Sequence, residues 1–334
     1  MFVADRWVNR AWKSALVIGV ATVGLWTATH GVAGVAWPDV GAVLRGVSAV
    51  HLLWLGVVWL AGLAIYAGGV LAPAMPGLGA RRGLLMNLTG SAVANVMPLG
   101  GAAATALNWR MARGWGHSDG AFLGFCVTTN VLDVMSKLAL PVAAVVALAI
   151  GSAPVPRAAW LLGDGCTVAF LVLVAVNVLM LRPGAAGRPS SRGGRLAAWR
   201  RSAREASERI RTLLGAQWRR LVPGSIAYLF AQVLLLGASL YSVGLRPPVV
   251  VVLMAAAVER LGTLVPITPG GAGIAEIGAV AWLVASGLDP ASAVAGVLLY
   301  RVFVFALEIP VGGLLLGGWA WSRRGRSPVT GAPT

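Results

Sequence analysis

Apolar stretches long enough to cross a lipid bilayer recur along almost the whole chain. About 20 apolar residues are needed to cross roughly 30 Å of hydrocarbon. Only an α-helix or a closed barrel satisfies every backbone group within lipid. The sequence therefore predicts an all-α, polytopic membrane protein in which residues 1–334 form a single membrane domain. The predicted full spans are residues 14–37, 49–71, 119–150, 158–181, 222–244 and 290–321.

The composition and the placement of charge agree with this class of protein. With 58% hydrophobic and 11% charged residues, the chain is far more apolar than an average soluble domain. Its net charge of +16 is concentrated in loops, where basic residues report membrane orientation. With the N-terminus in the cytoplasm, 21 Lys and Arg residues lie inside and three lie in outside loops. We therefore expect a multi-pass protein of the bacterial cytoplasmic (inner) membrane, with both termini cytoplasmic and no nucleic-acid partner.

The basic start of the chain, followed by apolar residues 15–36, also has the form of a secretory signal. The apolar run is longer than the usual core of such a signal, so we interpret it as an uncleaved first span.

Two further apolar segments are interrupted by proline and glycine and are too short to span in one piece. Residues 84–97 and 102–111 form the first broken pair, and residues 249–265 and 272–286 form the second. Basic residues flank both ends of the first pair and favour the cytoplasm at each end. We therefore expect both pairs to be re-entrant helical hairpins, which dip into the membrane and return on the same side.

Matching positions in the two halves predict an internal duplication. Pro98, Gly100 and Gly116 correspond to Pro269, Gly271 and Gly287, each at an offset of 171 residues. The repeat halves would be residues 14–150 and 158–321, each with three full spans and one hairpin. Because three is odd, the second half would be inverted, and matched broken helices in inverted repeats point to a transporter's binding site. Chance agreement in a glycine-rich chain is the alternative.

Residues 185–221 are predicted to form a cytoplasmic linker followed by a basic amphipathic helix. Residues 185–194 are rich in Gly, Ser and Pro, which is typical of a flexible connection. Beyond them, apolar residues recur at steps of three and four with arginines between them. This pattern predicts a helix on the membrane surface that orients the protein and attaches to anionic headgroups.

The two proline-glycine turns are the candidate binding elements. Each turn frees backbone groups that hydrocarbon cannot satisfy, and the helix that follows it presents unpaired N–H groups suited to phosphate or carboxylate. The alternative is that both turns are kinks serving close helix packing.

Ionisable residues within the apolar segments point to the same region, because each needs a partner or a wet cavity. We predict that Arg260 and Arg301 bind phosphate, since a guanidinium matches its oxygens bidentately, and that Glu276 balances their charge. Interhelical salt bridges are the alternative, and for Asp133 and Lys137 we favour a pair along their own helix. The candidate substrate-binding residues are Asn95, Pro98, Gly100, Gly101, Glu259, Arg260, Thr268, Pro269, Gly270, Gly271, Gly273, Glu276, Arg301 and Glu308.

The segment Thr268-Pro-Gly-Gly-Ala-Gly-Ile-Ala-Glu276, followed by Gly287 and Arg301, resembles the flippase-like membrane region of lysylphosphatidylglycerol synthases. The turn Pro98-Leu-Gly-Gly101 is similar to that family's earlier turn but lacks an acidic residue often found just after it. The resemblance implies a standalone member that moves lipids between leaflets. Since no soluble aminoacyl-transferase domain follows in this sequence, lysyl transfer to lipid is not expected.

The predicted function is transport of an anionic phospholipid or polyprenyl-phosphate lipid between leaflets. A membrane enzyme, a scaffold subunit in lipid-linked envelope synthesis and a channel are the alternatives. His30, His51 and His117 have no convincing sequence partners, and Cys126 and Cys166 lack metal-site spacing;. We therefore expect neither catalysis, nor a metal, nor a cofactor. The expected partners are the lipid itself and either an envelope-synthesis protein or a second copy of the chain.

Overall fold

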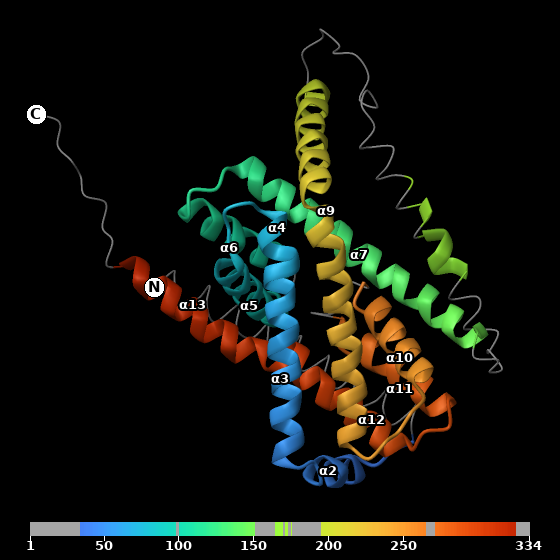
Figure 1. Ribbon diagram of the computed structural model, residues 1–334. Helices are drawn as coiled ribbons and strands as arrows, with labels where there is room; N and C mark the ends of the chain where they lie inside the picture. Colours follow the sequence, from blue (N-terminus) through green and yellow to red (C-terminus); the bar gives the residue numbers. More distant parts are fainter. Residues whose placement is uncertain are drawn as a thin grey trace, which may run out of the picture.

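The computed structural model describes residues 34–97, 100–150, 164–169, 171–172, 175, 195–264 and 271–324. Within these ranges every regular element is helical (Figure 1). Four helices are long and apolar enough to cross a membrane: Ala49–Ala74, Asp119–Ala147, Gln217–Ser242 and Pro290–Arg323. The chain is therefore an all-α, multi-pass membrane protein, and the four helices match four of the predicted spans. The other two predicted spans, residues 14–37 and 158–181, lie largely outside the described residues.

The labelled helices follow one another in the order α2 to α13 (Figure 1). Their bounds are α2 Trp37–Arg45, α3 Ala49–Tyr66, α4 Ala72–Ala74, α5 Ala80–Val96, α6 Gly100–Gly114, α7 Asp119–Ile150, α9 Arg195–Ser242, α10 Val249–Gly262, α11 Ile274–Ala285, α12 Pro290–Arg301 and α13 Glu308–Arg324. Two π-helical turns continue the helices they follow: Ala67–Leu71 joins α3 to α4, and Val302–Ala306 lies between α12 and α13.

The two broken apolar segments each form a pair of packed helices. In the second pair, a Cβ added at Gly262 would lie 2.6 Å from Ala275 Cα, and the Trp282 indole N–H donates to the Val251 carbonyl at 3.1 Å. The first contact joins the end of α10 to the start of α11, and the second joins the start of α10 to the end of α11. The two helices therefore form an antiparallel hairpin. Helices α5 and α6 are packed together in the same way, with Gly90 against Asn108.

Helices α3 and α9 run side by side (Figure 1), and the π-helical turn that continues α3 comes into backbone contact with α9. There, a Cβ on Gly224 would overlap the carbonyl group of Gly69. Glycine on both helices allows this approach, as is common where helices associate in lipid. The crossing fixes the distance between the two helices next to the site described below.

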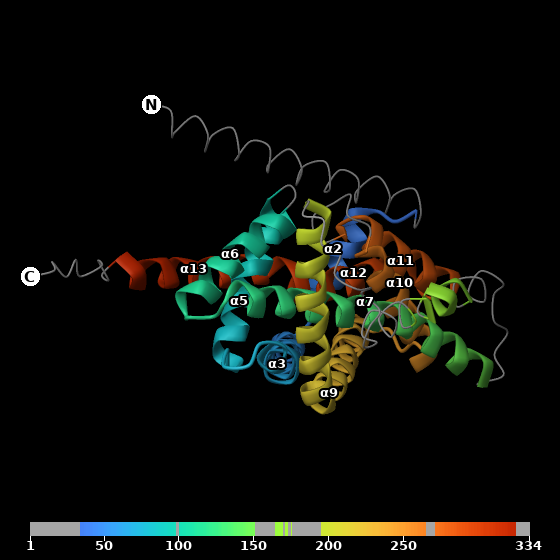
Figure 2. The same ribbon diagram turned by 90° about the horizontal axis from the view of Figure 1, so that it is seen from above.

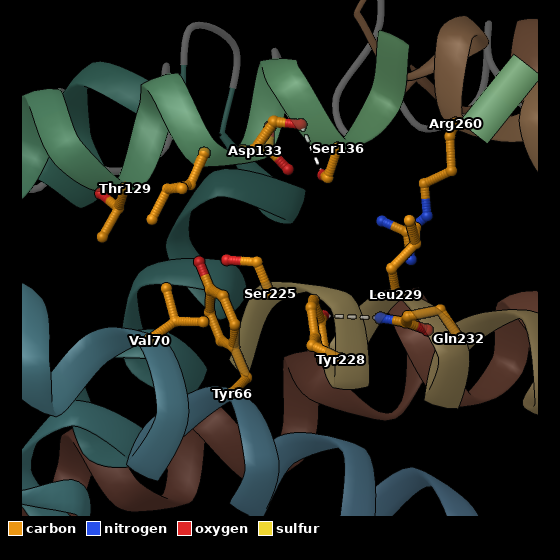
Figure 3. Close-up of a pocket in the computed structure, with 11 residues that line it drawn as sticks. Tyr66, Val70, Thr129, Asp133, Ser136, Ser225, Tyr228, Leu229, Gln232 and Arg260 are labelled. Atoms are coloured by element: carbon orange, nitrogen blue, oxygen red, sulfur yellow. Dashed lines mark hydrogen bonds between the residues drawn. The ribbon is translucent and has the colours of Figure 1, made fainter. Parts of the chain in front are cut away.

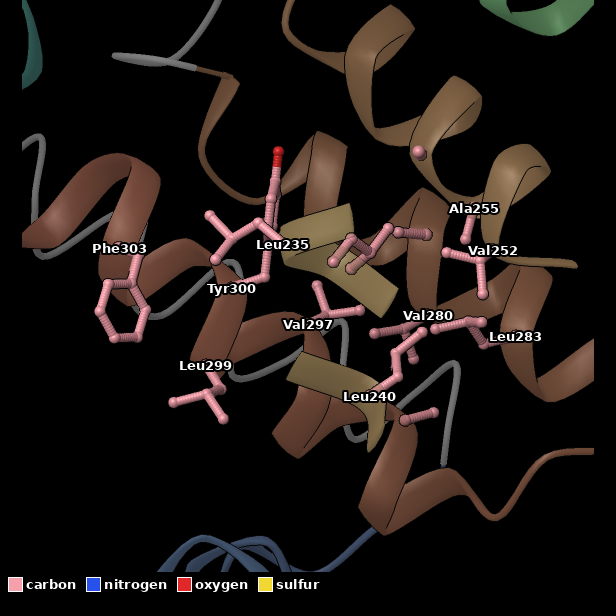
Figure 4. Packing of buried hydrophobic residues seen from close by; sticks show 14 of the residues in the cluster. Leu235, Leu240, Val252, Ala255, Val280, Leu283, Val297, Leu299, Tyr300 and Phe303 are labelled. Atoms are coloured by element: carbon pink, nitrogen blue, oxygen red, sulfur yellow. The ribbon is translucent and has the colours of Figure 1, made fainter. Parts of the chain in front are cut away.

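The larger apolar core joins α9, α10, α11 and α12. Leu240, Val252, Leu283 and Val297 are buried in it, and Figure 4 shows their side chains meeting between these helices. Helix α7 packs across α9 and α10 (Figure 2). In a bilayer such contact is driven mainly by close packing rather than by removal of apolar surface from water. The core therefore holds α10 and α12 firmly beside α9.

Two predicted features differ from the structure. The residues between the predicted spans 14–37 and 49–71 were expected to be an outside loop, but Trp37–Arg45 form α2, where a proline in the first turn starts the helix and Val40 is buried against its neighbours;. The basic segment was expected to lie on the membrane surface as a separate helix. Instead, Arg195–Ser242 is one continuous helix, whose basic end projects past the other labelled helices in Figure 1. Pro223 and Gly224 lie at the junction between the basic part and the span, yet the α-helix continues through both.

Candidate functional site

A buried arginine joins three helices at the centre of the site. Arg301, at the end of α12, places Nη1 3.1 Å from Glu259 Oε1 on α10 and Nε 2.6 Å from Glu276 Oε1 on α11. The exposed fractions of Glu259, Glu276 and Arg301 are 2%, 5% and 8%. Buried charges need partners of this kind. The contacts are those of an interhelical salt-bridge cluster, and they hold the second hairpin against the last span.

Glu276 also caps its own helix. Its Oε2 accepts a hydrogen bond of 2.7 Å from the Gly273 N–H at the start of α11, which is one of the two bonds of a capping box, since Gly273 has no side chain to make the other. Gly273 has φ +92°, a conformation that glycine adopts with little cost. The positive end of α11, predicted to face an anionic ligand, is therefore occupied by a carboxylate of the chain.

Arg260 lies next to Glu259 in the sequence but reaches a cavity that Glu259 does not line. Its Nη2 donates to the Tyr300 hydroxyl at 3.3 Å, and its Nε lies 3.7 Å from Glu259 Oε2. The guanidinium lines a narrow, partly open cavity (Figure 3). Among the described residues that line it, Arg260 is the only cation.

The rest of the cavity wall comes from four helical segments and is mostly polar. Rings of Tyr66 and Tyr228 stack with their centroids 4.4 Å apart, and Gln232 Nε2 donates to the Tyr228 hydroxyl at 2.6 Å. Asp133 faces the cavity from α7 and forms an ion pair with Lys137 at 2.7 Å. The lining residues are Tyr66, Val70, Thr129, Leu132, Asp133, Ser136, Ser225, Tyr228, Leu229, Gln232 and Arg260.

Sequence reasoning did not select the tyrosines, Ser225 or Gln232. A signal was nevertheless present, because Ser225, Tyr228 and Gln232 follow one another at helical spacing within an otherwise apolar span;. Three polar residues on one face of such a span indicate a polar contact or cavity.

A second, smaller cavity of about 230 Å³ adjoins the first. It is lined by Glu308 together with Trp59, Tyr228 and Gln232, the last two of which also line the first cavity. Glu308 is 9% exposed and forms a hydrogen bond with Ser91 of α5.

Arg301 and Glu308 are seven residues apart, a spacing that places two residues on the same face of a regular α-helix;. The π-helical turn Val302–Ala306 lies between them, and its wider turn changes their angular relationship. The two side chains therefore have different surroundings: Arg301 pairs with α10 and α11, whereas Glu308 lines the smaller cavity.

The first hairpin reaches the site through Asn95. Its Nδ2 donates to the Phe305 carbonyl at 3.5 Å, within the π-helical turn, and the Arg301 guanidinium lies 5.0 Å from the centre of the Phe305 ring. Gly100 and Gly101 begin α6, Gly271 precedes α11 with φ +69°, and none of the three lines either cavity. Pro98, Thr268, Pro269 and Gly270 lie outside the described residues.

The fold and the site define a helical, multi-pass membrane protein with charged residues buried between its helices. The chain belongs to the family described as the lysylphosphatidylglycerol synthase TM region, whose model matches residues 14–312. The matched region contains both hairpins, the Arg301 cluster and both cavities. No curated protein matches the chain significantly. Membership in this family relates the protein to the handling of membrane lipids.

Proposed function

We propose that this protein moves an anionic lipid, either a phospholipid or a polyprenyl phosphate, between the two leaflets of the inner membrane. The observation that carries the proposal is the position of Arg260, whose guanidinium lines a polar cavity inside an apolar bundle of helices. An arginine is costly at such a depth unless it meets an anion or a wet space. Glu259 compensates Arg260 only in part, because its carboxylate lies 3.7 Å away and is shared with Arg301. A lipid phosphate in the cavity would supply a second anion.

The chemistry of the cavity suits a phosphate. A guanidinium has five N–H donors in a fixed fork that matches phosphate oxygens, and one Arg260 nitrogen is engaged by the Tyr300 hydroxyl. Hydroxyl groups of Ser225 and Thr129 and the amide of Gln232 line the same space. The Ser225 and Thr129 hydroxyls donate to backbone carbonyls of their own helices. The neutral donors left for the headgroup oxygens are therefore the second N–H of Gln232 and the O–H of Tyr228, which accepts from Gln232;.

The shape of α9 allows the acyl chains to stay in the bilayer while the headgroup is bound. In this structure the space beside Arg260 admits little more than a water molecule;, so the helices around it must move apart to admit a headgroup. On the neighbouring face of α9, Val222, Ile226, Phe230 and Leu234 are exposed at every fourth position. This apolar stripe gives the chains a path beside the polar cavity.

In the proposed transport, Arg301 contacts the headgroup after Arg260 does. In the structure it is bound to Glu259 and Glu276, so it binds a phosphate only if Glu276 releases it. We assign the first contact with the headgroup to Arg260 and the second to Arg301, with Glu276 exchanging between arginine and the helix cap. This exchange would move the second hairpin relative to α12.

The proposed architecture has six full spans and two re-entrant hairpins, arranged as an inverted repeat with both termini in the cytoplasm. Support comes from local geometry at the offset of 171 residues. Gly116 and Gly287 have φ +88° and +85°. Two residues later, Ser118 and Asp289 accept hydrogen bonds from the N–H groups of Ala121 and Ser292. Helices α7 and α12 then begin at corresponding positions.

The test is leaflet exchange of a fluorescent phosphatidylglycerol in proteoliposomes. Arg260→Ala should slow exchange by at least about tenfold, because a charge-assisted hydrogen bond contributes about 1.5–3 kcal/mol. Arg260→Lys should retain part of the rate, since it keeps the charge without the fork. Arg246→Ala is the matched control, because Arg246 is exposed in the α9–α10 connection and stacks on Tyr241 away from the cavity. If Arg260→Ala exchanges the lipid as fast as the unmodified protein, Arg260 is not part of the headgroup site.

A further inference from the structure

The charges inside the described helices do not balance. Within the apolar lengths of α7 and α10 to α13 lie four carboxylates, Asp133, Glu259, Glu276 and Glu308, and three cations, Lys137, Arg260 and Arg301. Three of the carboxylates have an ion pair within 4.0 Å: Asp133 with Lys137, Glu259 with both arginines, and Glu276 with Arg301. Glu308 has none among the described residues. It is therefore the carboxylate whose charge this part of the chain leaves uncompensated.

The surroundings of Glu308 favour a neutral carboxyl group. It is 9% exposed, lines a cavity together with Trp59 and Leu63 of α3, and forms a hydrogen bond with Ser91 of α5. The groups that act on it electrostatically are Arg260 on α10 and Arg301 on α12. An ionised carboxylate without an adjacent cation is costly in such a place, and binding a proton removes that cost.

Glu308 is close enough to the headgroup cavity for the two sites to affect each other. Tyr228 and Gln232 line both cavities and are joined by a hydrogen bond of 2.6 Å. Tyr66, the other titratable group of this wall, stacks on Tyr228. The wall between Glu308 and Arg260 is thus a pair of hydrogen-bonded side chains, and charges interact strongly across a low-dielectric interior.

We propose that Glu308 is a proton-binding site and that the anionic headgroup enters the Arg260 cavity together with a proton on Glu308. This inference rests on the proposed function and names the proton as the ion whose binding is coupled to lipid binding. The proton comes from water and binds one carboxylate oxygen, so no other bond changes. A phosphodiester with one negative charge then enters with one positive charge, and the interior gains no net charge.

The coupling follows from competition for Arg260. An ionised Glu308 and a bound phosphate are both attracted electrostatically to the Arg260 guanidinium, and the two anions repel each other. Protonation of Glu308 removes the repulsion, so the proton strengthens headgroup binding and the headgroup strengthens proton binding by the same factor. Headgroup affinity should therefore rise as pH falls through the range in which Glu308 takes up its proton.

The experiment is calorimetric titration of the full-length protein in detergent with short-chain phosphatidylglycerol, in buffers of different ionisation enthalpy. This lipid is a phosphodiester, so it does not itself titrate near neutral pH. We expect uptake of up to about one proton per lipid bound. Between about pH 8 and pH 5.5 the affinity should rise about 5-fold to 150-fold, the usual size of such a coupling.

The variants assign the proton to its residue. Glu308→Gln mimics the protonated side chain, so it should bind the lipid with no proton uptake and little dependence on pH. Asp289→Asn is the matched control: Asp289 is an exposed helix cap, and asparagine caps equally well. It should retain both the uptake and the pH dependence.

Three results would overturn the inference. If the unmodified protein binds lipid without taking up a proton, proton coupling is refuted, whereas the proposed lipid transport is not. This measurement does not depend on the folding of any variant. Proton uptake that persists in Glu308→Gln would place the proton elsewhere. No lipid binding at any pH would remove both this inference and the function on which it rests.

Discussion

Arg301 and Glu276 form the shortest ion pair among the described residues, with 2.6 Å between Nε and Oε1. The pair ties the end of α12 to the first turn of α11, and the same guanidinium also holds Glu259 of α10. One side chain therefore fixes the second hairpin to the last span.

Removing Arg301 should destabilise the protein strongly. Arg301→Ala leaves Glu259 and Glu276 buried without their main cation, and breaking a buried pair in this way typically costs about 3–5 kcal/mol. Glu276→Gln should cost less, because the amide oxygen still accepts from the Gly273 N–H. Thermal unfolding in detergent measures both. A double variant whose loss equals the sum of the two single losses would show that the pair is not coupled.

The Gly69–Gly224 crossing should control both stability and transport. In Gly224→Ala the new methyl group overlaps the carbonyl group of Gly69, so α9 must move away from α3 and the cavity between them changes shape. We expect a loss of about 1–3 kcal/mol, as for other overpacked sites, and slower leaflet exchange. Gly215→Ala, on the same helix with nothing within 4 Å, is the control and should be neutral or slightly stabilising. Equal stability and equal exchange rates of the two variants would contradict the close contact between Gly69 and Gly224.

The Tyr228 hydroxyl should contribute to headgroup binding. Tyr228→Phe keeps the stacked ring but removes the acceptor of the Gln232 N–H. An unsatisfied buried donor costs about 1–3 kcal/mol, so exchange of phosphatidylglycerol should slow by about fivefold or more. Tyr241→Phe alters an exposed tyrosine of the same helix, outside both cavities, and should leave the rate unchanged. A normal rate in Tyr228→Phe would exclude the hydroxyl from the transport path.

The proposed topology predicts labelling from opposite sides of the membrane. Gly46 lies between α2 and α3, and Gly215 lies exposed on the basic part of α9. In a background with Cys126 and Cys166 replaced by alanine, Gly46→Cys should react with an impermeant maleimide in intact cells. Gly215→Cys should react only after the membrane is opened. Reaction of both from outside would refute the cytoplasmic placement of the basic segment.

The positions of the spans were predictable because hydropathy is local. The predicted segment 49–71 corresponds to Ala49–Ala74, and the predicted segment 290–321 to Pro290–Arg323. Proline and glycine likewise marked where the hairpins turn, since each changes the backbone at its own position. The continuous helix Arg195–Ser242 was missed, because amphipathic spacing alone does not tell a surface helix from the extension of a span.

The sequence alone determined that Glu259, Arg260, Glu276, Arg301 and Glu308 lie in apolar surroundings and need partners, because insertion of a charge into lipid is costly wherever it occurs. Only the tertiary structure decided which partner each one has. Helix packing brings Arg301 to two carboxylates from different helices and places Arg260 opposite Tyr66 and Tyr228. The π-helical turn after Arg301 separates it from Glu308. These pairings depend on helix crossings such as Gly69–Gly224, which join residues far apart in the chain and leave no pattern in the local sequence.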